Sequence, residues 1–232
     1  MKRIEQESAE RLVLIVRTLL NCILVLIFFG APLFLPAGTL RFWNAWLFLG
    51  PFDVCFFLIL LYFALTNPEY ARKRFKGEEK ETPQKIVMSL LVFSALSTLA
   101  VAGFDHRFHW STVPLIFVIV STVVMIGGFV MLFMVMKQNN YTSRVIEIQK
   151  DQKVIDTGMY SIVRHPMYLA FSIIFLFVPI VLGSWYSLIP AGCIPLLVTF
   201  RIRNEEEVLK TGLAGYDSYM RKVGYRLVPY VW

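Results

Sequence analysis

Two short polar clusters contain the residue types that could carry out chemistry in this sequence. The first cluster, residues 157–168, reads TGMYSIVRHPMY and contains Arg164, His165 and two tyrosines. The second cluster, residues 201–207, reads RIRNEEE. Arginine and histidine side chains donate hydrogen bonds to anionic groups, whereas glutamates and tyrosine hydroxyls accept them. The two clusters together could therefore form one polar binding site.

Pro166 breaks the regular backbone inside the first cluster. Proline has no N–H to donate within a helix, and it shifts the preceding residue, His165, towards extended backbone. Irregular backbone beside a membrane is tolerated where it lines a cavity, which favours a ligand site. The residues alone leave a second interpretation open, a membrane-edge turn in which Arg164 reaches lipid phosphates and the tyrosines form an aromatic belt.

The second cluster has the spacing of a helix. Arg201 and Glu205 are four residues apart and share one helix face, and Arg203 and Glu207 share another. Three adjacent glutamates spread over about 200° of a helix, so they cannot all serve one site. The alternative interpretation is a solvated helix with weak ion pairs.

The elements that must position these clusters are membrane-spanning helices. The chain has 232 residues, of which 57% are hydrophobic and 15% aromatic, and its mean hydropathy is +0.62. Soluble domains contain about 45–50% apolar residues, so the composition indicates an integral membrane protein. A helix needs about 20 apolar residues to cross a bilayer. Four runs are suitable, at residues 12–35, 42–65, 86–103 and 113–136.

A fifth apolar region, residues 169–200, is interrupted by Gly183 and Ser184 and contains three prolines. Two short helices packed as a hairpin explain this region better than one very long helix. The hairpin returns the chain to the same side, so the two polar clusters are expected to be neighbours. The predicted fold is therefore an all-α integral membrane protein with about four transmembrane helices, a C-terminal helical hairpin and a cytoplasmic C-terminal helix.

The distribution of lysine and arginine predicts the orientation. With the N-terminus in the cytoplasm and six crossings, the cytoplasmic segments hold twenty of these residues and the outer loops hold only Arg41 and Arg107. Cytoplasmic segments are enriched in lysine and arginine, so both clusters are expected on the cytoplasmic side of a multi-pass protein. The net charge of +7 follows from this topology and does not indicate nucleic acid. The three cysteines lie in apolar runs without metal-ligand spacing, so no metal site is expected.

Asp53 is the one acidic residue inside a predicted span. Its expected depth is similar to that of Asn21, and Arg17 lies about one helical turn nearer to the cytoplasm. A polar contact of Asp53 with Asn21 or Arg17, which would join the first two spans, is the simpler explanation. A functional role in a cavity is the alternative.

The order of the motifs resembles the isoprenylcysteine carboxyl methyltransferase family and, more distantly, the phospholipid methyltransferases. Gly-x-Tyr and Arg-His-Pro-x-Tyr precede the hairpin, and Arg-x-x-x-Glu-Glu-x-x-Leu, Gly-Tyr-x-x-Tyr and Pro-x-x-Trp follow it. The resemblance covers about residues 139–232, and one departure is Ala170, where the family has a glycine. The matching residues are Gly158, Tyr160, Arg164, His165, Pro166, Tyr168, Arg201, Glu205, Glu206, Leu209, Gly215, Tyr216, Tyr219, Pro229 and Trp232.

The resemblance implies an S-adenosylmethionine-dependent methyltransferase embedded in the membrane, with its cofactor pocket on the cytoplasmic side. It assigns Arg201 to substrate binding and catalysis, and Glu205 to catalysis and to the cofactor. The cofactor-binding residues that it implies are Gln152, Lys153, Val154, Ile155, Tyr160, His165, Pro166, Met167, Tyr168 and Glu205.

A carboxyl group is the preferred methyl acceptor. A carboxylate is ionised at neutral pH because its pKa is about 4, so it needs no base, and the planar guanidinium of Arg201 could hold it. An amine acceptor would instead need a base such as Glu205 or Glu206. The expected partner is a lipophilic acceptor such as an isoprenylcysteine-type carboxyl, which enters from the bilayer among the membrane lipids.

Residues 1–138 are expected to form the N-terminal transmembrane helices and to recognise the acceptor, and residues 139–232 are expected to form the methyltransferase core. Two alternatives stay open. NADPH-dependent membrane reductases of the sterol reductase type share a related His-Pro-x-Tyr region, but usually have asparagine where Met167 stands. A non-enzymatic membrane protein is the other, although few ionisable groups lie within the spans, which argues against transport.

Overall fold

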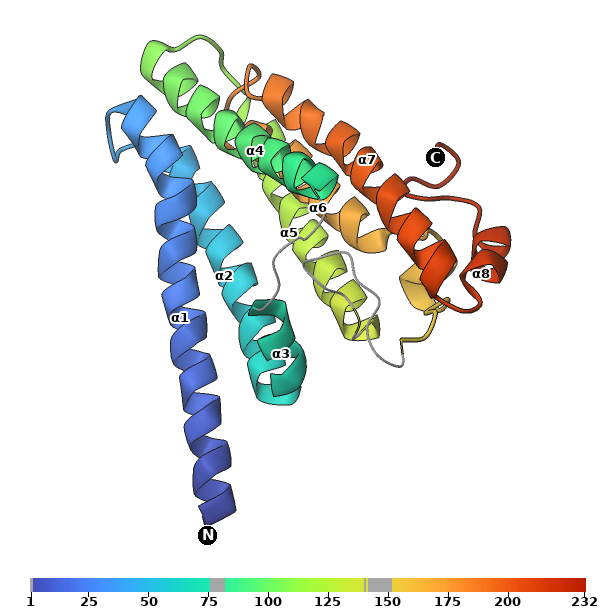
Figure 1. Cartoon of the computed structure of the whole chain (residues 1–232). Helices are drawn as coiled ribbons and strands as arrows, with labels where there is room; N and C mark the ends of the chain where they lie inside the picture. Colours follow the sequence, from blue (N-terminus) through green and yellow to red (C-terminus); the bar gives the residue numbers. More distant parts are fainter. Residues whose placement is uncertain (1, 76–81, 140, 142–151) are drawn as a thin grey trace.

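Every regular element in the described part of the chain is a helix. The computed structural model describes residues 2–75, 82–139, 141 and 152–232, and these residues contain no strand, which confirms the all-α prediction (Figure 1). The elements are α1 (Lys2–Ala37), α2 (Trp43–Thr66), α3 (Pro68–Phe75), α4 (Thr82–Phe108), α5 (Leu115–Gln138), the 3-10 helix η1 (Gly158–Ser161), α6 (Pro166–Val181), α7 (Leu188–Gly212) and α8 (Tyr216–Lys222).

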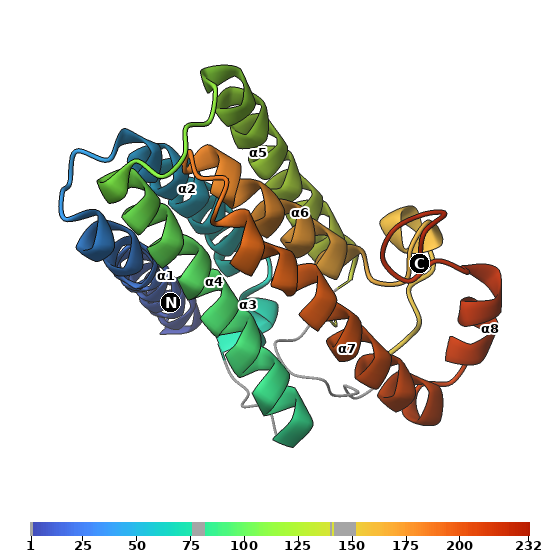
Figure 2. The same cartoon turned by 90° about the horizontal axis from the view of Figure 1, so that it is seen from above.

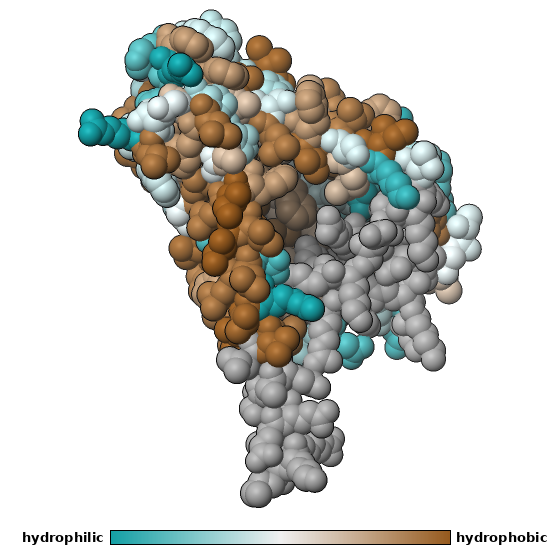
Figure 3. Space-filling model, turned by 60° about the vertical axis from the view of Figure 1, so that its left-hand side comes forward, coloured by the Kyte–Doolittle hydropathy of each residue, from teal (hydrophilic) through white to brown (hydrophobic). Residues whose placement is uncertain are grey.

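Four of these helices are long and apolar enough to cross a membrane. The apolar stretch of α1 starts at Val13, and the other three candidates are α2, α4 and α5 over their full lengths. They expose large apolar side chains such as Leu24, Phe93 and Phe117, and Figure 3 shows apolar surface of this kind over one side of the molecule. The four predicted spans, and with them a multi-pass membrane protein, are confirmed.

The predicted hairpin is formed by α6 and α7. Pro166 occupies the first turn of α6, where the missing N–H of proline has no helical partner to lose. After α6, Gly183 adopts a left-handed conformation with φ of +76°, which glycine accepts without steric cost. α7 continues past the apolar part to Gly212 and includes residues 201–207, so the second cluster lies on a helix as its spacing predicted. α8 is the predicted C-terminal helix.

The turn of the hairpin packs against the loops at one end of the bundle. Asn44, at the start of α2, donates a hydrogen bond from Nδ2 to the carbonyl of Val181, over 2.9 Å. Ser184 in the turn donates to Oδ2 of Asp105, near the end of α4, over 2.5 Å. Both polar clusters therefore lie at the opposite end, beside the end of α5 and the beginning of α4 (Figure 2).

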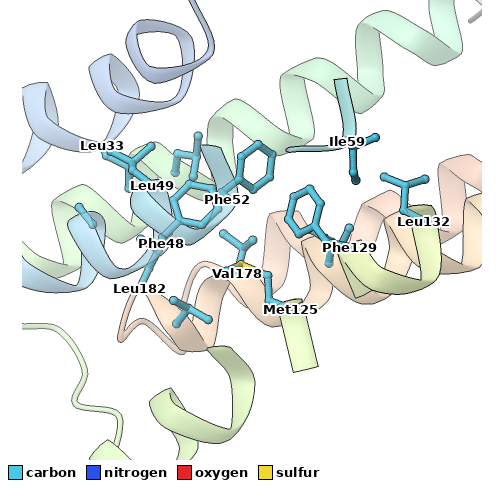
Figure 4. Packing of buried hydrophobic residues seen from close by; sticks show 14 of the residues in the cluster. Leu33, Phe48, Leu49, Phe52, Ile59, Met125, Phe129, Leu132, Val178 and Leu182 are labelled. Atoms are coloured by element: carbon cyan, nitrogen blue, oxygen red, sulfur yellow. The ribbon is translucent and has the colours of Figure 1, made fainter. Parts of the chain in front are cut away.

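The largest hydrophobic cluster joins α2, α5 and α6. Phe52 of α2 meets Phe129 of α5 edge to face with ring centroids 5.0 Å apart, and Figure 4 shows both rings beside Val178 of α6. Gly128 allows α5 and α6 to pack closely, because a Cβ atom there would lie 2.7 Å from Cγ1 of Ile174. Since this cluster contains residues on both sides of position 138, the N-terminal helices and the C-terminal part form one bundle.

Asp53 of α2 does not form the expected hydrogen bond with Asn21 of α1. Oδ1 of Asp53 and Nδ2 of Asn21 are buried, and neither atom has a hydrogen-bond partner among the residues that the structure describes. The two helices are joined by aromatic packing instead, with the ring of Phe29 centred 6.2 Å from Phe48 and 4.9 Å from Phe52. The described residues also show no ion pair between Asp53 and Arg17, the other expected partner, so aromatic packing joins these two helices here.

Candidate active site

A pocket opens at the end of the bundle where the two polar clusters lie. The empty space in and above the pocket is about 860 Å³, which includes the open solvent at its mouth. The pocket is lined by the segment before η1, by η1 itself, by the start of α6, by α7 and by the region of α8. All the site residues predicted from the sequence line it: Gln152, Lys153, Val154, Ile155, Tyr160, His165, Pro166, Met167, Tyr168, Arg201 and Glu205.

Tyr168 connects the two residues of α7 that were predicted for the site, Arg201 and Glu205. Its hydroxyl donates a hydrogen bond to Oε2 of Glu205 over 2.6 Å and accepts one from Nε of Arg201 over 2.9 Å. Burial raises the pKa of Tyr168 well above its usual value, and the Glu205 carboxylate raises it further. The phenol therefore stays neutral and fixes the Arg201 guanidinium and the Glu205 carboxylate relative to each other.

Gln84 of α4 contacts a residue of the pocket wall, and the sequence analysis missed it. Its Oε1 atom accepts a hydrogen bond from Nη1 of Arg201 over 3.2 Å, and the side chain is 2% exposed. In the sequence, Gln84 sits at the end of a charged loop just before the third apolar run, where no local signal distinguishes it from other loop residues. This contact brings one of the N-terminal helices to the edge of the pocket.

Arg164, which lines the pocket, forms a buried ionic network with Glu206. Glu206 is 2% exposed, and it accepts hydrogen bonds from Nε of Arg164 over 2.7 Å and from Nε of Arg226 over 2.8 Å. Nε2 of His165 lies 3.3 Å from the same carboxylate. Arg164 also donates to the carbonyl of Val223 over 2.7 Å. Its guanidinium is therefore paired within the protein, which contradicts the interpretation that Arg164 reaches lipid phosphates. Arg164 also lines the pocket, so its role as a ligand donor stays a prediction.

Glu206 is not a base of the site. Burial alone would raise its pKa, but hydrogen bonds from His165, Arg164 and Arg226 lower it to about 2. Glu206 also lies outside the pocket lining, so the suggestion that it could deprotonate an amine acceptor is wrong. Glu205 lines the pocket and Glu207 is exposed, which confirms that the three glutamates do not serve one site.

The C-terminal segment fixes the irregular backbone before α6. The amide of Arg164 donates to the carbonyl of Tyr225 over 2.9 Å, and the amide of His165 donates to the carbonyl of Arg226 over 2.9 Å. The Arg226 guanidinium also lies over the ring of Trp232, with Cζ 5.1 Å from its centroid. The Pro-x-x-Trp motif thus has a structural role, because it holds Arg226 against both Glu206 and the His-Pro segment.

Residues at the end of α5 hold η1 and Tyr160 in place through hydrogen bonds. Oε1 of Gln138 accepts a hydrogen bond from the amide of Met159 over 3.2 Å, and Nδ2 of Asn139 donates to the Tyr160 hydroxyl over 3.1 Å. On the other side, the Tyr219 hydroxyl donates to the carbonyl of Tyr160 over 2.7 Å. Tyr160 is therefore held from two elements that are distant in the sequence.

Replacing Gly158 by alanine should lower the thermal stability of the protein in detergent. Gly158 has φ of +57°, and an added Cβ atom would lie 2.1 Å from Nε2 of Gln138. A left-handed conformation costs an alanine about 1–2 kcal/mol, and moving Gln138 would also weaken its bond to Met159. Gly224→Ala is the control, because its added Cβ meets nothing within 4 Å. Equal unfolding temperatures for Gly158→Ala and wild type would contradict this account.

The segment before the pocket is described only in part. The sequence analysis assigned residues 152–155 to the cofactor, and these residues line the pocket without regular secondary structure. Residues 142–151, which precede them, lie outside the described part of the chain.

Residues 118–211 match the sequence profile of the isoprenylcysteine carboxyl methyltransferase (ICMT) family. The match starts in α5 and ends in α7, so it contains the hairpin and both polar clusters, and it confirms the resemblance stated above. It begins earlier than the predicted region 139–232 and stops before the Gly-Tyr-x-x-Tyr and Pro-x-x-Trp motifs. No curated protein matches the chain significantly.

Proposed function

Starting from the isoprenylcysteine carboxyl methyltransferase domain at residues 118–211, we propose that this protein is a membrane-embedded methyltransferase that uses S-adenosylmethionine. Its acceptor in this proposal is the carboxyl group of a lipophilic molecule of the isoprenylcysteine type. The observation that carries the proposal is one pocket that contains the implied cofactor residues beside the buried guanidinium of Arg201. The cofactor, when bound, supplies a methyl group that its positively charged sulfur activates towards a nucleophile.

The pocket suits the chemical groups of this cofactor. The Glu205 carboxylate offers a partner for an ammonium group, as carboxylates accept strong charge-assisted hydrogen bonds. Residues 152–155 line the pocket in backbone that is neither helix nor strand, so their amides and carbonyls are not used by a regular element. The Tyr216 hydroxyl is buried at the pocket without a hydrogen-bond partner among the described residues. S-adenosylmethionine, a nucleoside that carries an amino acid, has groups that could bind the Glu205 carboxylate, this backbone and the Tyr216 hydroxyl.

Arg201 is placed to hold an acceptor carboxylate. Its side chain is buried in the pocket wall, where a charge acts more strongly than in water. Tyr168 and Gln84 fix the orientation of the guanidinium through Nε and Nη1. Since a carboxylate is already ionised at neutral pH, the residues need only orient it, exclude water and leave Glu205 for the cofactor.

The location of the pocket supports a lipophilic acceptor. The pocket lies at one end of a bundle whose outer surface is apolar, so a lipid-like chain could stay in the bilayer while its polar end reaches Arg201. Contact between Gln84 and Arg201 supports a role for the N-terminal helices in acceptor recognition. The excess of lysine and arginine in segments at this end supports a cytoplasmic orientation.

Calorimetric titration of the detergent-purified protein with S-adenosylmethionine tests the cofactor part of the proposal. We expect the wild type to bind, and His165→Ala and Glu205→Ala each to bind at least tenfold more weakly, which corresponds to about 1.4 kcal/mol. Both residues line the pocket from different elements, His165 before α6 and Glu205 on α7. A loss in both variants means that the two clusters bind one ligand.

Glu207→Ala is the matched control for this titration. Glu207 is exposed on the same helix and does not line the pocket, so its variant should bind like the wild type. If the wild type does not bind S-adenosylmethionine, the proposed function is wrong. A titration with NADPH then tests the reductase alternative on the same sample.

A further inference from the structure

Tyr216 has a buried hydroxyl that nothing in the described structure satisfies. The residue is 4% exposed and lines the pocket, and its hydroxyl oxygen has no hydrogen-bond partner among the described residues. Tyr219, one turn further along α8, forms a contrast, because its hydroxyl donates to the carbonyl of Tyr160 over 2.7 Å. An unpaired buried hydroxyl destabilises the folded protein, because it loses its hydrogen bonds to water and gains none. Phenylalanine at position 216 would fill the same space without that cost, so the hydroxyl points to a ligand contact.

The surroundings of Tyr216 differ from the rest of the pocket. Its ring belongs to an apolar cluster with Leu213, and Val154 and Leu209 pack against this cluster. The charged groups, the Arg201 guanidinium and the Glu205 carboxylate, are bonded to Tyr168 on the side where α6 and α7 meet. The pocket therefore has an apolar side at α8 and a charged side at α6.

Tyr216 acts as a neutral phenol. Burial raises its pKa far above the usual value, and the carboxylates of Glu206 and Glu205 raise it further. The hydroxyl therefore keeps its proton at neutral pH, and it can donate a hydrogen bond to an acceptor atom of a ligand.

We propose that the Tyr216 hydroxyl donates a hydrogen bond to a ring nitrogen of the adenine of bound S-adenosylmethionine. This inference rests on the proposed function and names the part of the ligand that each side of the pocket takes. The purine has apolar faces, which suit Val154, Leu209 and Leu213, and acceptor nitrogens on its edge. The amino-acid end of the cofactor carries charges of both signs, and it pairs with the charged side of the pocket, where Glu205 lies.

Calorimetry with two ligands tests the contact. Tyr216→Phe should bind S-adenosylmethionine about tenfold more weakly than the wild type, and it should bind adenosine weaker by a similar factor, because both ligands contain the base. Glu205→Ala should weaken S-adenosylmethionine binding and leave adenosine binding unchanged. Equal affinities of Tyr216→Phe and wild type for S-adenosylmethionine would overturn the inference, and so would a loss restricted to the larger ligand, which would place the contact away from the base.

Thermal unfolding without ligand separates this role from a structural one. Tyr216→Phe removes an unpaired buried hydroxyl, so its unfolding temperature should equal or exceed that of the wild type. Tyr219→Phe loses a formed hydrogen bond, so its unfolding temperature should fall. A fall of similar size in both variants would make Tyr216 a packing residue and overturn the inference.

The binding partner of Tyr216 on the base can be identified with deaza analogues of S-adenosylhomocysteine that lack single ring nitrogens. The wild type should bind one of these analogues more weakly than S-adenosylhomocysteine itself. Tyr216→Phe should bind that analogue and S-adenosylhomocysteine with the same affinity. Uniform affinities across the series in the wild type would contradict the contact. If the wild type and Tyr216→Phe bind S-adenosylmethionine with equal affinity, only this inference is wrong. If the wild type does not bind S-adenosylmethionine, the proposed function is wrong.

Discussion

Glu206→Gln should be the most destabilising of the single substitutions considered, lowering the free energy of unfolding by about 3–5 kcal/mol. The carboxylate is 2% exposed and bonded to the guanidinium groups of Arg164 and Arg226. A neutral amide leaves these cations without a counter-charge, and the links from α7 to the His-Pro segment and to the C-terminal segment weaken together. Chemical or thermal unfolding in detergent, with Glu207→Gln as the exposed control, measures the effect.

The pH dependence of the same pair of proteins checks the cause. The pKa of Glu206 is lowered from 4.5 to about 2 in the folded protein, so its contribution to stability is complete above pH 4.5 and is lost as the pH falls towards 2. The stability difference between wild type and Glu206→Gln should therefore shrink over this range. A difference that does not change between pH 5 and pH 2 would mean that the ionic network is not the source of the effect.

Arg201→Lys should lower kcat/KM for methyl transfer by at least a hundredfold, about 2.7 kcal/mol. The Arg201 guanidinium bonds Tyr168 and Gln84 while facing the pocket. A lysine keeps the charge but has no planar fork, so it cannot hold these partners and a carboxylate at once. A transfer assay with N-acetyl-S-farnesylcysteine and S-adenosylmethionine, together with calorimetry for the cofactor alone, measures the two effects separately.

Cofactor affinity decides how this result is interpreted. If Arg201 holds the acceptor, the affinity of Arg201→Lys for S-adenosylmethionine should stay within about threefold of the wild type, which is well under 1 kcal/mol. Arg203→Lys, an exposed substitution on the same helix, should leave both transfer and binding unchanged. Parallel loss of transfer and cofactor affinity in Arg201→Lys would assign the residue to the cofactor side and contradict the acceptor role.

Much of the architecture was predictable because bilayers impose simple length and composition rules. Apolar runs of about 20 residues specify spans, and the interruption at Gly183 divides the last apolar region into α6 and α7. Helical spacing separated Glu205 from Glu206 and Glu207, because adjacent residues on a helix point in directions about 100° apart. The ends of the helices were less predictable, and α4 begins and ends several residues outside the expected span 86–103.

The candidate site was predictable where its residues lie within motifs, and unpredictable where it depends on partners from other elements. Gln84 contacts Arg201 from 117 positions away in the chain, and its own neighbours in sequence belong to no recognisable motif. The sequence also could not show that Asp53 and Asn21 form no hydrogen bond, because this contact depends on how two helices pack. Similar depth in the membrane does not fix the rotation of two helices about their axes, and that rotation decides which side chains meet.

The sequence by itself determined the spans, the hairpin, the end of the bundle that carries both polar clusters, and the residues of the pocket lining that belong to recognisable motifs. Only the tertiary structure distinguished Arg164 from Arg201. Both are buried arginines that line the pocket, but Arg164 is paired with Glu206, 42 positions away, whereas Arg201 is bonded to Tyr168 and Gln84. The physical reason is that a buried charge is defined by its partners, and folding, not proximity in the chain, chooses them.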